Sequence, residues 1–318
     1  MAGRVSAPSL EVSDLVVRFG QRAVVDRVAY RIEPGRTLGV VGESGCGKSM
    51  TALSLLGLVP APGEVAGSIR LGGEELIGQS RAAWRGMRGR RVAMIFQEPM
   101  TALNPVMRVG TQIAEIMVLH KGASWEAAEA EAVRLLEAVG IASPRDRARN
   151  YPHQMSGGMR QRAMIAMALA GEPGLLVADE PTTALDVTIQ AQILDLMREL
   201  QARTGMAIQF ISHNLAVVSE LAHDIVVMYA GRVVERAPAA TLFAHPRHPY
   251  TQGLIATLPD PERRVARLPV IRGGVPNLDH VTGCRFADRC PIAEPSCRSA
   301  EPELHVAAEG HDVACFKS

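Results

Sequence analysis

The sequence predicts an α/β fold in which helices cover a buried, mostly parallel sheet, and three observations support this. Four short apolar runs have the length and hydrophobicity of strands buried on both faces. Helical segments separate the runs, and in the clearest of them apolar residues recur every three or four positions. A glycine-rich loop links the first run to a helical segment. The runs lie at residues 38–41, 92–96, 175–178 and 207–211, and the apolar stripe consists of Ile189, Ile193, Met197 and Leu200.

The length and composition of the chain exclude several kinds of protein. Its 318 residues suffice for one large α/β domain with an appendage, but not for two such domains in tandem. Lys and Arg total 34 against 33 Asp and Glu, so the chain lacks the positive field of a nucleic-acid coat. No apolar segment approaches the roughly 20 residues that cross a bilayer, and residues 1–20 contain no signal-like apolar region. We therefore expect the chain to stay in the cytosol, docked on something that spans the membrane.

The order of the elements predicts two domains. Residues 9–32 are typical of an antiparallel hairpin, broken at Gly20, at the edge of a sheet. A helical run is predicted at 50–58, and a longer helical stretch, broken at Pro152, indicates an inserted helical subdomain over about 98–172. Prolines crowd the sequence beyond residue 231 and the regular pattern fades. We expect a first domain over residues 1–240 and a smaller one over 241–318.

Residues 42–49 have the pattern of a phosphate-binding loop, in the strand-loop-helix context that such a loop requires. Its glycines let backbone N–H groups converge on phosphate oxygens, and the following helix presents a partial positive charge there. We expect Lys48 to reach the terminal phosphates and Ser49 to bind magnesium. Cys46 fills a variable position of the loop.

The run at 175–178 leads into two adjacent carboxylates, Asp179 and Glu180. We expect Asp179 to hold magnesium through its water shell. A second carboxylate beside a triphosphate is electrostatically unfavourable unless it orients or deprotonates the attacking water, so we assign that role to Glu180. His213 follows the run at 207–211 and is expected to contact the γ-phosphate. Together these residues predict an enzyme that hydrolyses ATP.

A second glycine loop, formed by Ser156, Gly157 and Gly158, also leads into a helix and provides a further anion site. One nucleotide does not need two such loops from one chain. We therefore expect this loop to close on the γ-phosphate held by a different subunit, so that ATP joins the two subunits.

This set of motifs resembles that of the ABC-type ATPases, and more closely the dipeptide and oligopeptide importer branch, over nearly the whole chain. The signature reads Met-Ser-Gly-Gly-Met where the general pattern is Leu-Ser-Gly-Gly-Gln, but Ser-Gly-Gly-Met-Arg-Gln-Arg is similar to one of the two ATPase subunits of peptide importers. Residues 97–105 and the sequence His248-Pro249-Tyr250 indicate the same branch. The resemblance implies a P-loop NTPase: a RecA-like core with an antiparallel β edge, an inserted helical subdomain and a small metal-stapled extension.

The resemblance also implies a role for each matching residue. Glu180, His213 and Gln97 would be catalytic, Phe19 would stack on adenine, and Asp186 would belong to the D-loop. Magnesium would be bound through Ser49, Gln97 and Asp179. The ATP-binding loop would consist of Gly42, Glu43, Ser44, Gly45, Cys46, Gly47, Lys48, Ser49 and Met50. The signature facing the ATP of the partner subunit would consist of Ser156, Gly157, Gly158, Met159 and Gln161.

Four of the five cysteines, Cys284, Cys290, Cys297 and Cys315, fall near the end of the chain. In a reducing compartment such crowding indicates a metal more than disulfides, although the spacing matches neither common zinc fingers nor ferredoxins. The resemblance implies a 4Fe-4S cluster on these four residues, with zinc and unliganded or disulfide-bonded cysteines as the alternatives. Three nearby histidines could replace a ligand, but we expect each to be solvated at the surface. They are His280, His305 and His311.

The resemblance implies an ATPase subunit that powers the import of dipeptides or oligopeptides, bound peripherally to the cytoplasmic face of the inner membrane. Its implied partners are a second ABC ATPase subunit, expected to be a paralogue, two membrane permeases and an extracytoplasmic solute-binding protein, with no nucleic acid. A nickel or other small-solute importer of the same family is the alternative. A soluble ABC ATPase of DNA repair is a distant one, because the segment between Lys48 and Ser156 is too short for a long coiled-coil insertion.

Overall fold

The computed structural model describes residues 8–98, 102–183, 185–258, 270–276 and 281–318. His280 therefore lies outside the described residues, as do residues 99–101. So does Ala184, two positions before Asp186 of the expected D-loop. The chain folds into two units that interleave along the sequence. Unit 1 is drawn from Met1–Leu10, Ile32–Arg36 and Gly78–Gln209, and unit 2 from Glu11–Arg31, Thr37–Ile77 and Phe210–Ser318.

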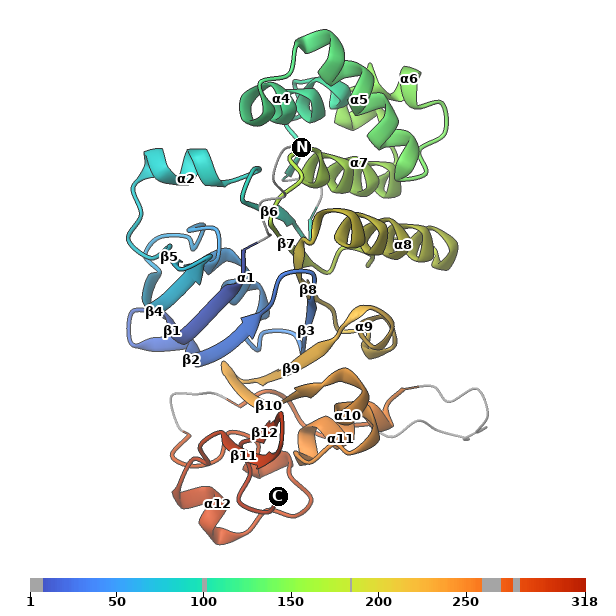
Figure 1. The fold of residues 1–318 in the computed structure, drawn as a ribbon. Helices are drawn as coiled ribbons and strands as arrows, with labels where there is room; N and C mark the ends of the chain where they lie inside the picture. Colours follow the sequence, from blue (N-terminus) through green and yellow to red (C-terminus); the bar gives the residue numbers. More distant parts are fainter. Residues whose placement is uncertain (1–7, 99–101, 184, 259–269, 277–280) are drawn as a thin grey trace. The chain divides into compact units, whose positions relative to one another are not determined.

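Unit 2 contains the predicted antiparallel edge. Its four-stranded sheet has the order β2-β1-β4-β5 (Figure 1). The hairpin expected at residues 9–32 is confirmed, because β1 and β2 are neighbours joined by a turn at Gly20, whose positive φ of 62° suits glycine. The strands are β1 (Leu10–Phe19), β2 (Arg22–Ile32), β4 (Glu64–Leu71) and β5 (Glu74–Glu75).

A second set of strands in unit 2 begins with β3 (Thr37–Val41), which pairs in parallel with β9 (Asp224–Tyr229). Strand β10 (Arg232–Pro238) pairs antiparallel with β9 and with β12 (His311–Val313), which in turn pairs with β11 (His305–Ala308). The last strands of the chain therefore extend the sheet that contains β3. The helices of this unit are α1 (Lys48–Ser54), α9 (Leu215–Leu221), α10 (Ala239–Ala244), α11 (Pro249–Ala256), the short 3-10 helix η3 (Ala287–Arg289) and α12 (Pro295–Ser299).

Unit 1 contains a parallel pair, β6 (Val92–Ile95) and β7 (Leu175–Asp179), with β8 (Ala207–Ile211) beside β7. Strand β8 starts in unit 1 and ends in unit 2. The helical stretch predicted before β7 is confirmed and consists of several separate helices. Pro152, the predicted break, begins a short 3-10 helix. The helices of unit 1 are α2 (Arg81–Met87), α4 (Val109–Lys121), α5 (Trp125–Ala138), α6 (Pro144–Ala148), η1 (Pro152–Gln154), α7 (Gly157–Ala170) and α8 (Val187–Thr204).

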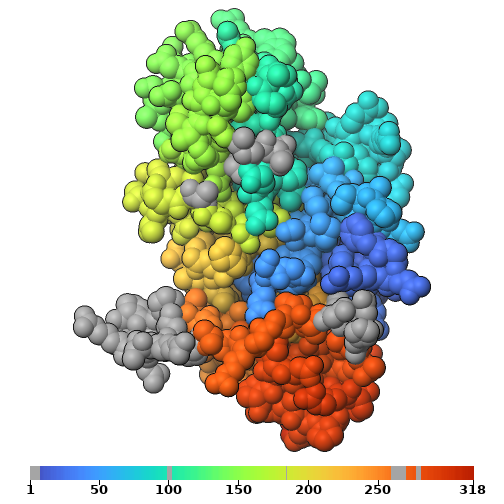
Figure 2. All heavy atoms as spheres, turned by 180° about the vertical axis from the view of Figure 1, so that it is seen from behind, coloured from blue at the N-terminus to red at the C-terminus, as the bar shows by residue number. Residues whose placement is uncertain are grey.

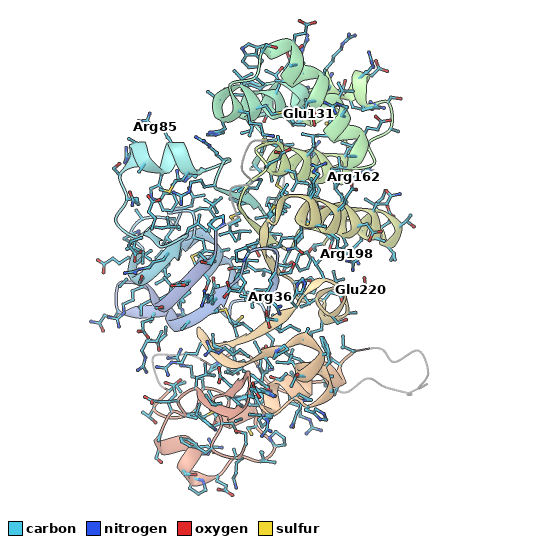
Figure 3. All side chains as sticks on the ribbon, in the orientation of Figure 1. Arg36, Arg85, Glu131, Arg162, Arg198 and Glu220 are labelled. Carbon is cyan, nitrogen blue, oxygen red and sulfur yellow. The ribbon has the colours of Figure 1, made fainter. Side chains whose placement is uncertain are left out.

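Burial follows the predicted pattern. Every residue of β3, β6, β7 and β8 is buried, which confirms the four apolar runs as interior strands. On α8, Ile193, Met197 and Leu200 of the apolar stripe are buried. A polar contact joins two helices of unit 1. Arg162 of α7, labelled in Figure 3, donates a hydrogen bond to the carbonyl of Gly140, which follows α5, at 2.6 Å.

One predicted helix differs in its bounds. The run expected at residues 50–58 is helical only over Lys48–Ser54, because Gly57 adopts a positive φ of 60° and Pro60 follows. Within the described parts of the chain, no helix combines the length and the apolar character needed to cross a membrane.

Candidate functional site

The loop at residues 42–49 depends on its glycines. Gly42 has a φ of 149°, and a Cβ there would lie 2.2 Å from the carbonyl oxygen of Met228. Gly47 has a φ of 100°, and a Cβ there would lie 2.6 Å from the carbonyl oxygen of Val24. Any side chain at these two positions would clash with backbone, so the loop can take this path only with glycine.

Lys48 closes the loop on itself. Its side chain is buried, and its ammonium group donates to the carbonyl oxygens of Gly42 at 2.7 Å and Glu43 at 2.9 Å. Cys46 is fully buried, and its sulfur lies 3.6 Å from the Lys48 nitrogen. Burial raises the pKa of the Cys46 thiol more than the nearby ammonium lowers it, so Cys46 packs beneath the loop as a neutral thiol.

In unit 1, one of the two carboxylates at the end of β7 lies beside the predicted glutamine. Asp179 ends the strand and is buried. The side-chain amide of Gln97 donates to Glu180 at 3.3 Å, and the hydroxyl of Thr183 donates to the same carboxylate oxygen at 3.1 Å. Glu180 has a positive φ of 49°, a strained conformation for a residue with a side chain. The structure therefore brings Gln97, Glu180 and Thr183 together at the end of β7.

The second glycine loop forms the start of α7. Ser156 is the N-cap and accepts a hydrogen bond from the N–H of Met159 at 3.3 Å, while Ser156 and Gly157 are exposed. Gln161 differs from its neighbours, because it is buried and its amide donates to the carbonyl of Pro181 after β7. Gln161 therefore links the helix to the turn that carries Glu180.

The remaining predicted residues occupy loops and element ends. Asp186 is the N-cap of α8 and accepts from the N–H of Ile189 at 3.0 Å. His213 is exposed after β8, just before Asn214 caps α9. Phe19 ends β1, and a Cβ at Gly63 would come within 2.9 Å of its ring. The predicted residues thus fall into two groups: Gln97, the signature, Asp179, Glu180 and Asp186 in unit 1, and Phe19, residues 42–50 and His213 in unit 2.

Sequence reasoning did not identify two residues of the extension that contact the phosphate loop. The hydroxyl of Tyr250 accepts a hydrogen bond from the N–H of Glu43 at 2.8 Å, and the guanidinium of Arg289 pairs with the Glu43 carboxylate. The only sequence signal was the His248-Pro249-Tyr250 stretch, which indicated a family but no contact.

The four clustered cysteines line one small cavity together with His248 and Phe286. All are free thiols, and burial raises the pKa of Cys284, Cys290 and Cys315. Neighbouring cysteine charges raise the pKa of Cys284 further. Among the described residues, no group of three or more His, Cys, Asp or Glu side chains is arranged so that it could hold a metal ion. The structure therefore gathers the four thiols without showing a ligand geometry.

The expectation for His311 was wrong. The residue is 1% exposed, and its Nε2 lies 2.7 Å from the buried carboxylate of Glu235. Glu235 also accepts from the backbone N–H groups of Arg247 at 2.7 Å and His248 at 3.0 Å. This carboxylate needs several hydrogen-bond donors because it is fully buried. His311 is therefore buried beside it rather than solvated at the surface. His305 is exposed as expected.

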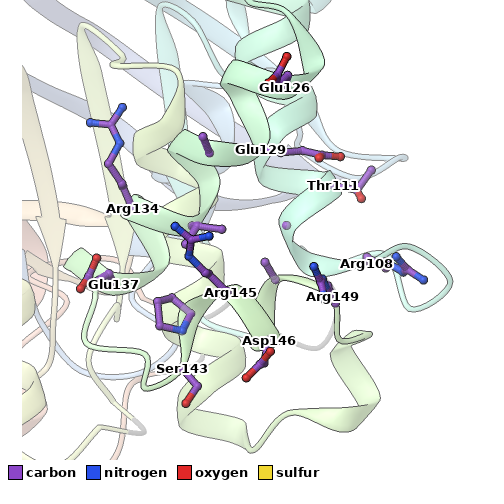
Figure 4. A pocket seen from close by; sticks show the side chains of 15 residues that line it. Arg108, Thr111, Glu126, Glu129, Arg134, Glu137, Ser143, Arg145, Asp146 and Arg149 are labelled. Carbon is purple, nitrogen blue, oxygen red and sulfur yellow. The ribbon is translucent and has the colours of Figure 1, made fainter.

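A wide pocket of about 1050 Å³ lies among α4, α5 and α6 (Figure 4). Arginines and carboxylates both line it, including Arg108, Arg145, Glu126 and Glu129. None of the predicted catalytic or nucleotide-binding residues belongs to its lining. Its mixed charges give no specific ligand chemistry.

Comparison with known proteins finds relatives that match nearly the whole chain. Residues 25–183 match the family described as "ABC transporter", and residues 234–297 match "Oligopeptide/dipeptide transporter, C-terminal region". The chain is 51% identical to the probable peptide ABC transporter ATP-binding protein y4tR of Sinorhizobium fredii, over 97% of this chain and 95% of the relative. It is 48% identical to the dipeptide transport ATP-binding protein DppD of Escherichia coli, over 96% of this chain and 95% of the relative. It is 46% identical to the oligopeptide transport ATP-binding protein AppD of Bacillus subtilis, over 96% of each.

The fold is also similar to a solved one. A dimeric structure of a bacterial ABC transporter cassette superposes with a TM-score of 0.66 at 22% identity, covering 72% of this chain and 98% of that chain. At this identity the likeness shows a shared fold alone.

Proposed function

The chain belongs to the ABC transporter family, as an ATP-binding subunit of its dipeptide and oligopeptide importer branch, and we propose how its residues work. Residues 1–240 form the ATPase domain, with the helical subdomain at about 98–172, and residues 241–318 form the extension. The observation that carries the assignment to peptide import is the match of residues 234–297 to the C-terminal region of peptide transporters.

ATP binds to residues 42–50, with Phe19 against adenine and Lys48 on the terminal phosphates. The buried position of Lys48 supports this, because an ammonium already held at the loop loses little freedom when it meets phosphate. Magnesium would be held by Ser49, Gln97 and Asp179. Glu180 activates the attacking water, with Gln97 and His213 as the other catalytic residues.

The signature residues Ser156, Gly157, Gly158, Met159 and Gln161, with Asp186 of the D-loop, act on the nucleotide of a second ATPase subunit. Support comes from the exposure of Ser156 and Gly157 at a helix N-terminus, where anions are stabilised. Closure of the pair on ATP, and its release after hydrolysis, drives two permease subunits that receive peptide from a solute-binding protein. The subunit is attached through them to the cytoplasmic face of the inner membrane.

Thiolates suit both zinc and iron-sulfur clusters, and the four cysteines line one cavity. Cys284, Cys290, Cys297 and Cys315 would hold a 4Fe-4S cluster, or Zn²⁺ as the alternative, and either would supply a structural crosslink of the extension. Support comes from their shared cavity and free thiols. Anaerobic purification should give about four iron atoms per chain with visible absorbance, and a colourless, iron-free protein would refute the cluster.

Transport tests the function as a whole. A strain whose own peptide importer is deleted, complemented with this chain and its neighbouring transporter genes, should accumulate a radiolabelled dipeptide, and Lys48→Ala should abolish uptake. Uptake of nickel but not of dipeptide by the complemented strain would overturn the peptide assignment.

A further inference from the structure

The second residue of the phosphate loop, Glu43, is held by two side chains of the extension. Both terminal nitrogens of the Arg289 guanidinium donate to its carboxylate, at 2.7 Å and 2.8 Å. Its backbone N–H donates to the hydroxyl of Tyr250 at 2.8 Å. All three residues belong to unit 2, so these contacts lie within one compact body. Residues more than 200 positions apart therefore fix one end of the loop.

The Arg289 pair differs from an ordinary surface ion pair. The Arg289 side chain is only 6% exposed and that of Glu43 is 27% exposed. A two-pronged, shielded guanidinium-carboxylate contact is stronger and more directional than exposed pairs. The hydrogen bonds to Glu43 accordingly raise the pKa of Arg289 above its usual range.

Arg289 is itself fixed by the extension. Its Nε donates to the carbonyl of Arg272 at 2.8 Å, and one terminal nitrogen lies 3.2 Å from the hydroxyl of Tyr229. The guanidinium also lies over the rings of Tyr229 and Phe286, at 5.6 Å and 5.9 Å from their centroids. The position of the Glu43 carboxylate is thus set by packing around Arg289.

Tyr250 is also fixed by packing. It is fully buried, and its ring centroid lies 4.7 Å from the ring centroid of Tyr229 and 5.4 Å from that of Phe286. His248 caps α11 by accepting from the N–H of Tyr250 at 3.0 Å. Burial raises the pKa of Tyr250, so its hydroxyl stays neutral and can accept from Glu43.

These contacts address an electrostatic problem of the loop. A carboxylate at its second position would repel a bound triphosphate, and a guanidinium in direct contact cancels that charge. On the inner side, Lys48 bonds the carbonyls of Gly42 and Glu43. The loop backbone is therefore held by Lys48 from within and by the extension from outside.

We propose that Arg289 and Tyr250 are positioning residues of the phosphate loop, through which the extension sets the affinity of the subunit for nucleotide. The inference rests on the proposed function in one respect, the binding of ATP at residues 42–49. It gives the extension a role in the ATPase cycle separate from any bound metal.

Nucleotide titrations of the full-length chain with fluorescent ATP analogue and magnesium test the Arg289 pair. Arg289→Ala should raise the Kd about tenfold, as expected for the loss of a hydrogen-bonded charge. Arg289→Lys should recover part of the affinity, because it restores the charge without the two-pronged contact. Adding Glu43→Gln to Arg289→Ala should recover part of the lost affinity, since it removes the uncompensated charge at the loop but does not restore the two-pronged contact.

The double variant tests whether Arg289 acts through Glu43. If Arg289 served only stability, Glu43→Gln would recover none of the affinity that Arg289→Ala loses, and the proposal would fail. Arg298→Ala is the matched control, because Arg298 belongs to the same extension but pairs with Asp288 at the exposed surface. Thermal unfolding of each variant identifies any that do not fold.

Tyr250→Phe gives an independent test, because the ring stays and only the acceptor of the Glu43 N–H is lost. We expect the Kd to rise about threefold or more while the chain stays folded. Lys48→Ala separates a failure of the positioning role from a failure of the proposed ATP site. If Lys48→Ala abolishes binding while Arg289→Ala and Tyr250→Phe do not weaken it, the positioning role is refuted and the ATP site stands. If Lys48→Ala binds nucleotide normally, the proposed site itself is refuted.

Discussion

The side-chain amide of Gln97 donates a hydrogen bond to the carboxylate of Glu180, joining the segment after β6 to the end of β7. The same carboxylate accepts from Thr183, and the Glu180 backbone is held in the left-handed region. A side chain held by two donors on a strained backbone is oriented rather than free, which is what a water-activating base requires.

Glu180→Gln should therefore leave ATP binding intact but lower hydrolysis at least about a hundredfold, because an amide cannot accept the proton of the attacking water. The rate of phosphate release by the assembled transporter measures the effect, with equilibrium nucleotide binding measured beside it. Asp195→Asn, at an exposed carboxylate of α8 that pairs with Arg198 at 2.8 Å, is the control and should keep full turnover. Unchanged hydrolysis in Glu180→Gln would remove Glu180 from the mechanism.

Ser156→Ala should weaken the ATP-dependent association of the two ATPase subunits about tenfold, because it removes the hydroxyl that we propose contacts the phosphate of the partner subunit. The lost N-cap also costs about 1 kcal/mol of stability. Ser124→Ala removes an equivalent cap, since Ser124 accepts from the N–H of Ala127 at 3.3 Å at the start of α5. Equal losses of association in the two variants, measured by light scattering with Glu180→Gln present, would contradict a phosphate contact by Ser156.

Glu235→Ala should destabilise the fold by about 3 kcal/mol, because it leaves buried donors without their acceptor. The donors are the backbone N–H groups of Arg247 and His248, and the contact with His311 is lost as well. Thermal unfolding followed by circular dichroism measures the change. Glu303→Ala, at an exposed position of the same extension, should shift the midpoint little. A similar shift in both variants would show that Glu235 does not anchor the extension.

Stability should fall as the pH drops from about 6.5 to about 4. Burial lowers the pKa of His248 from 6.5 to about 4, so the unfolded chain takes up a proton in this range while the folded chain does not. His248→Asn keeps an N-cap acceptor but cannot titrate, so its unfolding midpoint should depend less steeply on pH. His305→Asn, at an exposed position, should behave like the wild type. Parallel pH profiles for His248→Asn and the wild type would refute this effect.

Local pattern was sufficient for much of the fold. The four apolar runs became β3, β6, β7 and β8 because strands buried on both faces need continuous apolar sequence. The phosphate loop was recognisable because its backbone path excludes side chains at Gly42 and Gly47. Such features depend on residues within a few positions of each other, so the sequence alone specifies them.

Contacts between distant segments could not be predicted in this way. Nothing in the spacing of Glu43 and Arg289, 246 positions apart, indicates that they meet. His311 looked like a surface residue because its burial depends on Glu235, 76 positions earlier. In both cases a buried or shielded charge must be matched by a partner that the folded chain delivers, and periodicity carries no information on that partner.

Sequence pattern alone was enough to predict the α/β class, the phosphate loop, the signature helix and the clustering of cysteines near the end of the chain. The folded chain was needed to show that Tyr250 and Arg289 contact the phosphate loop and that the four thiols share one cavity. Strands, helices and glycine turns arise from short-range sterics and hydrophobic periodicity, whereas ion pairs and buried side-chain clusters arise from the packing of segments that the fold brings together.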